Sequence, residues 1–239
     1  MKTIDYNELD IISYNHNSGS FAEIDKCIFN GEIYALKRFT NGKYLNGKRR
    51  KISELSSIND SHLITPKFWV KNEEGKNQYL AKFCYGDPLE FEKNTNVVAK
   101  LKHAKNLIEK MHSYKIIHGD LNISNLLFSG DEPFIIDFDN VSLNNSNVDI
   151  SSLNDYSADY IKRLGINKGL DVYLFNLLTY AILNETDYYR VRSNVLAKKY
   201  GVFDFKDGIK LCNLFSLEKG YSDDDYLIDM ISNEYVKNI

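Results

Sequence analysis

The chain has 239 residues, a mass of 27.7 kDa and a formal net charge of −3, with 30 basic against 33 acidic side chains. This near-neutral balance gives no general attraction to nucleic acid or to an acidic membrane, so a nucleic-acid partner is not expected. Hydrophobic residues make up 43% of the chain, close to the globular norm, which allows a sizeable core in one domain or in two small lobes.

The cysteines and the N-terminal residues indicate the cellular compartment in which the protein is expected. Cys27, Cys84 and Cys212 lie far apart in the sequence. An odd, scattered set argues against a disulfide framework or a zinc cluster and favours free thiols. The N-terminus lacks the pattern of a signal peptide, and no apolar run approaches the length of a membrane span. We therefore expect a cytoplasmic protein without a membrane span.

The first third of the chain has the pattern of strands joined by turns. Apolar stretches between polar turns predict strands over 9–14, 24–28, 33–39, 66–70 and 78–84. The dipeptide Asn30-Gly31 suits a hairpin turn between the second and third of these strands. Apolar residues at helical spacing behind a basic start predict a helix over 48–58.

The remainder of the chain has helical periodicity. Apolar side chains from Val97 to Met111 recur on one helical face, behind a polar run at 94–96 that can cap the helix. A later helix, over about 170–183, is apolar nearly all round and should be buried. The strand pattern of the first third and the helical pattern of the remainder therefore predict an α+β chain with a boundary near residues 84–88.

Two polar clusters stand out against the apolar, strand-like segments around them. One runs from His118 to Asn125, and the other ends the apolar stretch that leads to Asp137. Together they present Asp120, Asn125 and Asp137. Phosphoryl transfer from ATP needs such a set: one carboxylate orients the attacking hydroxyl, and an amide and a carboxylate hold magnesium against the phosphates.

These clusters, H-G-D-L-N-I-S-N and I-D-F-D, resemble the catalytic loop and metal-binding segment of the protein-kinase-like superfamily. The resemblance covers roughly residues 9 to 185. It implies a bilobal α+β fold with ATP between the lobes: a small antiparallel N-lobe with one helix over 1–84, and a mainly helical C-lobe over 85–239. It also implies that Asp120 is the base or orienter of the acceptor hydroxyl, and that Asn125 and Asp137 bind Mg²⁺.

The resemblance continues in the β-rich part. Ile33-Tyr34-Ala35-Leu36-Lys37 is similar to the kinase V-A-I-K strand, whose lysine neutralises the α- and β-phosphates of ATP. By that likeness Glu54, on the helix predicted over 48–58, would hold Lys37 in an ion pair. Two plainer interpretations stay open: a charge on an edge strand for Lys37, and a solvated helix carboxylate for Glu54.

Two further segments resemble the nucleotide-binding parts of kinases. The run from Asn17 to Ile24 is similar to the glycine-rich loop, although Asn17 and Ala22 replace two glycines that allow the backbone to approach the phosphates. The run from Leu80 to Gly86 is similar to the hinge that reads the adenine edge. The nucleotide contacts implied by these likenesses are Asn17, Gly19, Phe21, Ile24, Ala35, Lys37, Lys82, Cys84 and Leu127.

Departures from the protein-kinase pattern bear on the substrate. Gly119, Asn122 and Asp139 replace, in order, the arginine of H-R-D, a lysine near the transferred phosphate and the glycine of D-F-G. H-G-D-L-N-x-x-N with I-D-F-D is similar to the lipopolysaccharide Kdo kinases, and more loosely to aminoglycoside and choline kinases, which phosphorylate sugars and small alcohols. In the other direction, the run from Gly169 to Leu178 resembles a protein-kinase helix in which Asp171 braces the catalytic loop, although a plain helix-terminal acid would fit there too.

The chain is thus predicted to be an ATP- and Mg²⁺-dependent kinase that phosphorylates a hydroxyl. An atypical serine/threonine protein kinase is favoured, by a thin margin, over a sugar or small-molecule kinase. A nucleotide-binding pseudokinase that serves as a scaffold is the third possibility. The expected partners are ATP and a hydroxyl-bearing protein or small-molecule acceptor.

Overall fold

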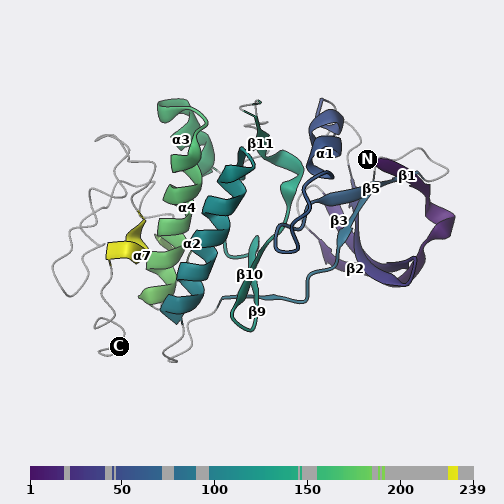
Figure 1. Ribbon diagram of the computed structural model, residues 1–239, viewed down its shortest axis with the longest axis horizontal. Coiled ribbons are helices and arrows are strands. Elements are labelled where there is room, and N and C mark those ends of the chain that lie inside the picture. The colour runs from purple at the N-terminus through teal and green to yellow at the C-terminus, as the bar shows by residue number, and fades with distance from the viewer. Residues whose placement is uncertain are drawn as a thin grey trace. The chain divides into compact units, whose positions relative to one another are not determined.

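A computed structural model describes residues 1–18, 22–40, 45, 47–71, 78–89, 97–144, 146, 155–184, 188, 190–191 and 226–230. The chain divides into two compact units (Figure 1). The first is Met1–Tyr85 with Ile135–Asp139, and the second is Gly86–Phe134 with Asn140–Ile239. The segment that carries Asp137, predicted to lie in the helical part, thus clusters with the β-rich unit.

The first unit is built on a six-stranded sheet in the order β1-β5-β6-β4-β3-β2, antiparallel except where β1 runs parallel to β5. The strands are β1 Lys2–Asp5, β2 Asp10–Ser18, β3 Ala22–Phe29, β4 Glu32–Phe39, β5 Pro66–Lys71 and β6 Gln78–Lys82. All the predicted strands are present. β1 was not predicted, because Ile4 is its one buried side chain and so short a strand shows no alternation.

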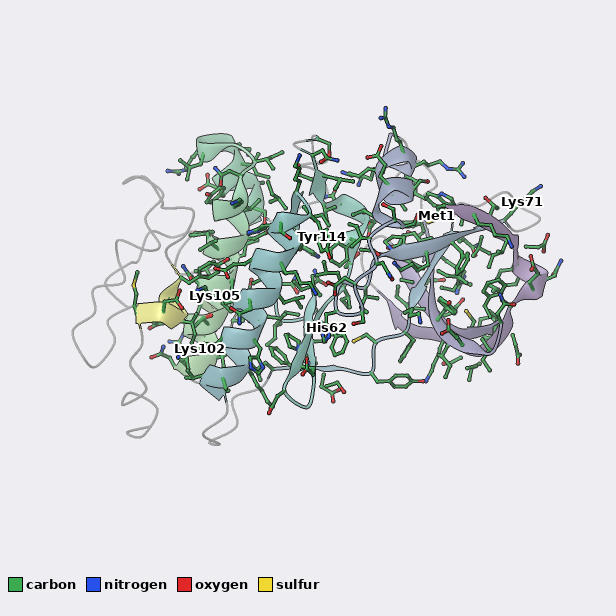
Figure 2. The ribbon with its side chains drawn as sticks, viewed as in Figure 1. Met1, His62, Lys71, Lys102, Lys105 and Tyr114 are labelled. Atoms are coloured by element: carbon green, nitrogen blue, oxygen red, sulfur yellow. The ribbon has the colours of Figure 1, made fainter. Side chains whose placement is uncertain are left out.

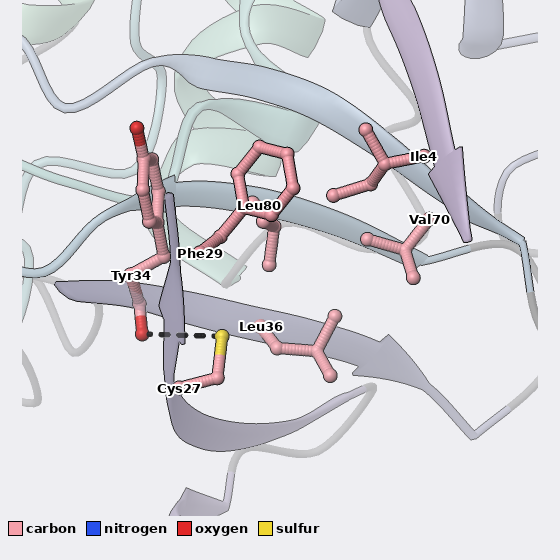
Figure 3. Close-up of a cluster of buried hydrophobic side chains, with 7 residues drawn as sticks. All are labelled: Ile4, Cys27, Phe29, Tyr34, Leu36, Val70 and Leu80. Carbon is pink, nitrogen blue, oxygen red and sulfur yellow. Dashed lines mark hydrogen bonds between the residues drawn. The ribbon is translucent and has the colours of Figure 1, made fainter. Parts of the chain in front are cut away.

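Alternation of side chains gives this sheet two apolar faces. Figure 3 shows the cluster on one face, in which buried side chains from five strands pack together: Ile4, Cys27, Phe29, Tyr34, Leu36, Val70 and Leu80. The second cluster consists of Ala22, Phe39, Leu45, Ile52, Trp69, Tyr79 and Ala81. Helix α1, Arg49–Leu55, contributes Ile52 to it. The helix is shorter than the predicted 48–58, since the amide of Ile58 bonds back to the carbonyl of Leu55 in a tighter turn.

The predicted hairpin between β3 and β4 turns on Asn30 and Gly31. Their φ angles are 50° and 77°, the left-handed pair that a two-residue hairpin turn requires. A Cβ on Gly31 would meet nothing within 4 Å, so a substitution there tests backbone conformation alone. We expect Gly31→Ala to lower the free energy of unfolding by about 1–2 kcal/mol in a urea titration. Gly31→Asn should cost less, since asparagine tolerates this conformation; an equal loss for both would contradict the account.

The buried thiol in Figure 3 gives a second test. Cys27 is fully buried, its Sγ lies 3.7 Å from the carbonyl oxygen of Tyr34, and burial together with Asp25 raises the pKa of the thiol to about 11. Roughly one thiol in a thousand is then ionised at pH 8. A Cys84→Ser/Cys212→Ser variant should not react with Ellman's reagent until urea unfolds it. The variant that keeps only the half-buried Cys84 should react while folded.

The second unit is mainly helical. The helices among its described residues are α2 Val97–Ser113, α3 Asp155–Leu164, α4 Lys168–Leu183 and α7 Leu227–Met230. Lys105 of α2, labelled in Figure 2, pairs with Asp229 of α7 at 2.7 Å. As predicted, α2 buries one apolar face and α4 is buried along nearly its whole length. Among the described residues, no helix is both long and apolar enough to cross a bilayer.

Short strands complete the second unit. β7 Asp87–Pro88, β9 Leu126–Ser129 and β10 Glu132–Ile135 form a three-stranded sheet, and β8 Ile116–Ile117 pairs with β11 Ser142–Leu143. The residues between β8 and β9 form the loop that holds Asp120 and Asn125. The loop is therefore fixed at both ends by strand pairing, which limits where these side chains can go.

Candidate active site

Lys37 lies in the interior of the first unit's sheet. On β4 it stands opposite Ile24 of β3 on one side and Tyr79 of β6 on the other. A residue paired on both sides cannot be an edge-strand charge, so that alternative is excluded. The side chain is 13% exposed. A lysine so placed needs an anionic partner, because an unpaired ammonium is costly to bury.

Two aspartates supply that partner. The Lys37 ammonium donates to Asp137 and, at 2.6 Å, to Oδ1 of Asp139. The Tyr79 hydroxyl lies 3.4 Å from the same Asp139 oxygen. The side chain of Asp139 is 3% exposed, whereas that of Asp137 is 39% exposed. The three residues Lys37, Asp137 and Asp139 are called the lysine cluster below.

The backbone conformation from Ile135 to Asn140 explains how the carboxylates of Asp137 and Asp139 come to face Lys37. Ile135, at the end of β10, forms an isolated parallel bridge with Leu63, in which its amide donates to the carbonyl of His62 at 2.9 Å. Asp137 then adopts a φ of 68°, in the left-handed region that aspartate tolerates better than most residues. The turn leads into a short 3₁₀ helix, η3 Phe138–Asn140, whose Phe138 is fully buried. Strained backbone held by such packing is typical of functional sites.

The electrostatics of the lysine cluster favour an additional cation. Burial lowers the pKa of the Lys37 ammonium, but Asp137 and Asp139 outweigh this effect and leave the pKa well above its usual value. Burial and the neighbouring Asp139 raise the pKa of Asp137, against the attraction of Lys37. Within the cluster, two carboxylates face one ammonium, so a divalent cation would be stabilised there.

The predicted ion pair between Lys37 and Glu54 is wrong for this structure. Glu54 accepts a hydrogen bond of 2.8 Å from the guanidinium of Arg50, one turn earlier on α1, and its side chain is 44% exposed. The plainer interpretation of Glu54 as a solvated helix carboxylate therefore describes it. Helical spacing identified the helix, but the direction in which Glu54 points depends on how that helix packs.

In the second unit, the loop between β8 and β9 brings Asp120 and Asn125 together. The amide nitrogen of Asn125 donates to the backbone carbonyl of Asp120 at 2.9 Å and lies 3.3 Å from its Oδ2. Asn122 also holds the loop: its side chain donates to the Asp120 carbonyl at 3.1 Å and accepts from the amide of Ser124 at 2.8 Å. This structural role for Asn122 was not predicted. The sequence feature that could have indicated it is the residue type, because an asparagine side chain can bond to the backbone two residues away in either direction.

Asp171 holds the loop between β8 and β9 through backbone hydrogen bonds, as the resemblance implied. Its carboxylate is fully buried and accepts hydrogen bonds of 2.8 Å from the amides of both His118 and Gly119. His112 contacts the same carboxylate through Nε2 at 2.9 Å. Gly119 has a φ of 74°, where glycine is unstrained and an arginine would not be. The ring of His112 and the backbone of His118 thus belong to one hydrogen-bond network, and Asp171 is more than a helix-terminal acid.

Comparison with known families agrees with this geometry. Residues 60–164 match the model of the Phosphotransferase enzyme family, a segment that contains Asp120, Asn125, Asp137 and Asp139. Over this segment the chain is similar to the phosphotransferases of the protein-kinase-like superfamily. The predicted α+β fold class is confirmed as well. The matched segment is less than half of the chain, and comparison with curated proteins gives no match. The match supports a phosphotransferase activity of the kinase type.

The predicted nucleotide contacts fall in both units. Ile24 and Ala35 are half-buried on neighbouring strands of the large sheet, and Leu127 is half-buried on β9. Lys82 is exposed and pairs with Glu32 at 3.1 Å, and Cys84 is half-buried just beyond β6. These positions identify no ligand, so the assignments remain predictions.

The predicted glycine-rich loop is described only in part. The backbone of Asn17 lies on β2 opposite Ile24. The side chain of Asn17 and the whole of Gly19 and Phe21 lie outside the described residues. The contacts of these three side chains with nucleotide therefore also remain predictions.

The donors predicted to hold the metal suit magnesium. The amide nitrogen of Asn125 makes the hydrogen bonds to Asp120, which leaves the amide oxygen to act as a ligand, and Asp137 offers a partly exposed carboxylate. Such hard oxygen donors match Mg²⁺, which usually takes one or two protein ligands and keeps water or phosphate for the rest. Within the described part of the chain, no group of three or more His, Cys, Asp or Glu side chains is arranged to hold a metal.

Proposed function

We propose that this protein transfers the γ-phosphoryl group of ATP to a hydroxyl group, with Mg²⁺ as cofactor. The observation that carries the proposal is the pairing of a buried, interior-strand lysine with the aspartates of I-D-F-D, in a chain whose other unit holds Asp120 and Asn125 on one braced loop. Phosphoryl transfer requires a lysine, a carboxylate that orients the acceptor and oxygen donors for the metal, and the family match covers Asp120, Asn125 and Asp137.

Each residue then has a defined task. Lys37, kept protonated by its carboxylate neighbours, would neutralise charge on the α- and β-phosphates. Asn125 and Asp137 would hold the metal, which supplies charge neutralisation at the phosphates when bound. Asp120 would accept a hydrogen bond from the acceptor hydroxyl and orient it for attack. Catalysis of this kind depends on placement and on electrostatic stabilisation, with no covalent intermediate on the protein.

Two acceptor classes are each favoured by a separate observation. The Asp171 brace beneath the catalytic loop resembles the protein-kinase arrangement and favours a serine or threonine hydroxyl of a protein. The loop itself, with Gly119 and Asn122 in place of arginine and lysine, favours a sugar or small alcohol, as in the families that share H-G-D-L-N-x-x-N. We place the protein acceptor first and the small-molecule acceptor second.

A labelling experiment tests the proposal and separates the two classes. The purified protein is incubated with γ-labelled ATP and Mg²⁺, alone, with a generic protein substrate, and with a panel of sugars and amino alcohols. Label on protein supports the first class, and label on a small molecule supports the second. Nucleotide binding without transfer to any acceptor would contradict the proposed activity and would favour the pseudokinase scaffold.

A further inference from the structure

The lysine cluster contains a carboxylate to which the proposed reaction gives no task. Asp137 is assigned to the metal, and Glu54 bonds to Arg50 on the surface of α1. Asp139 remains: it stands where the kinase D-F-G motif has glycine, yet it is the more buried of the two carboxylates in the cluster. A charged group is costly to bury without a partner, so its placement beside the Lys37 ammonium needs an explanation.

From this geometry we infer that Asp139, and not Glu54, is the residue that positions Lys37 for the phosphates of ATP; the inference rests on the proposed function. The 2.6 Å contact to Oδ1 of Asp139 joins the ammonium to the carboxylate that is shielded from water, where a charge-assisted hydrogen bond is strongest. Asp137 also contacts the ammonium, but it is the more exposed of the pair and so is the one accessible to a metal.

Tyr79 and the strand register support this assignment. Tyr79 lies directly opposite Lys37 in the β4–β6 ladder, so their side chains project from the same face of the sheet. Its hydroxyl lies 3.4 Å from the same Asp139 oxygen that Lys37 contacts. Lys37 and Tyr79, on neighbouring strands, therefore contact the same oxygen of Asp139, and these two contacts hold its carboxylate against the sheet. A carboxylate held in this way can orient a lysine without help from α1.

The test compares two isosteric changes, Asp139→Asn and Glu54→Gln. The first readout is the dissociation constant for ADP without metal, measured by titration calorimetry, because it needs neither turnover nor Mg²⁺. We expect Asp139→Asn to weaken ADP binding roughly tenfold, in keeping with the loss of one charge-assisted hydrogen bond, and to raise KM for ATP more than it lowers kcat. Glu54→Gln should stay within about twofold of wild type for both quantities.

A double-mutant cycle separates positioning from general structural damage. In a Lys37→Met background, Asp139→Asn should have no further effect on ADP affinity, since the group that it positions is gone. If the role of Asp139 were purely structural, Asp139→Asn would weaken ADP binding equally in both backgrounds, and that result would overturn the inference. So would a larger loss of ADP affinity for Glu54→Gln than for Asp139→Asn.

A second variant keeps the inference testable if Asp139→Asn does not fold. Tyr79→Phe removes the hydroxyl next to Asp139 while keeping the ring; it should weaken ADP binding a fewfold in wild type and not at all in the Lys37→Met background. An equal effect in both would overturn the inference. If the wild-type protein binds ADP but phosphorylates no acceptor, the proposed function is wrong, and the double-mutant cycle on ADP affinity still tests the role of Asp139. Wild type that binds no ADP would overturn both.

Discussion

Replacement of Asp120 by alanine is expected to lower kcat by about 10²–10⁴-fold, the usual contribution of a positioned acid–base group. The effect should fall on turnover and not on nucleotide affinity. Asn125 keeps its 2.9 Å hydrogen bond to the backbone carbonyl of residue 120, which the substitution leaves in place, and loses only the longer 3.3 Å contact to the side chain. The proposed metal ligand therefore stays where it is while the acceptor hydroxyl loses its partner.

The measurement is steady-state kinetics on whichever acceptor the labelling experiment identifies, with ADP affinity measured in parallel. Asp159→Ala is the matched control, because Asp159 is a half-exposed acid on α3 that pairs with Arg163 one turn away. The control should keep wild-type kcat. Wild-type turnover by Asp120→Ala would remove Asp120 from the catalytic role, and a parallel loss of ADP affinity would show that the substitution disturbs more than the acceptor.

Local patterns were sufficient to predict most of the secondary structure. Strands β2 to β6 and helices α2 and α4 follow from alternation and helical periodicity, since each buries one face or its whole surface. β1 was not predicted, because it pairs with β5, far along the chain, and because four residues with one buried side chain show no alternation. Long-range parallel pairing of so short a segment is decided by the assembled sheet and not by its own sequence.

The contacts within the loop between β8 and β9 were predictable for a different reason. Its polar residues stand within one short segment, so their mutual contacts depend on turn geometry that asparagine and glycine dictate locally. The Asp171 brace lies far along the chain, and it was predicted only through the family resemblance; the structure confirms it with two backbone amides on one carboxylate.

The partners of Lys37 could not be predicted by resemblance, because the carboxylates of Glu54, Asp137 and Asp139 were all available and sequence spacing does not say which of them reach it. α1 ends at Leu55 and leaves Glu54 at its surface, while the turn at Asp137 carries Asp139 inward. The sequence did contain a signal: an acid beside buried apolar residues in I-D-F-D requires a cation. A physical argument of this kind would have favoured Asp139 over a position copied from the family.

Replacement of Asp171 by asparagine is expected to lower the free energy of unfolding by about 2–4 kcal/mol. The fully buried carboxylate uses both oxygens, one for the amide of Gly119 and the other for the amide of His118 and the ring of His112. Asparagine has one acceptor oxygen, so its amide group would face a backbone N–H donor and leave it unsatisfied. Urea titration measures the loss.

The same substitution should also lower kcat, since the released amides belong to the two residues that precede Asp120. Asp159→Asn, on the exposed face of α3, should change the free energy of unfolding by less than about 0.5 kcal/mol. If Asp171→Asn were as stable as wild type, the two 2.8 Å bonds would not be holding the loop. If it were destabilised but fully active once folded, the brace would serve stability alone, and the position of Asp120 would have to be fixed by Asn122 and Asn125 from within the loop.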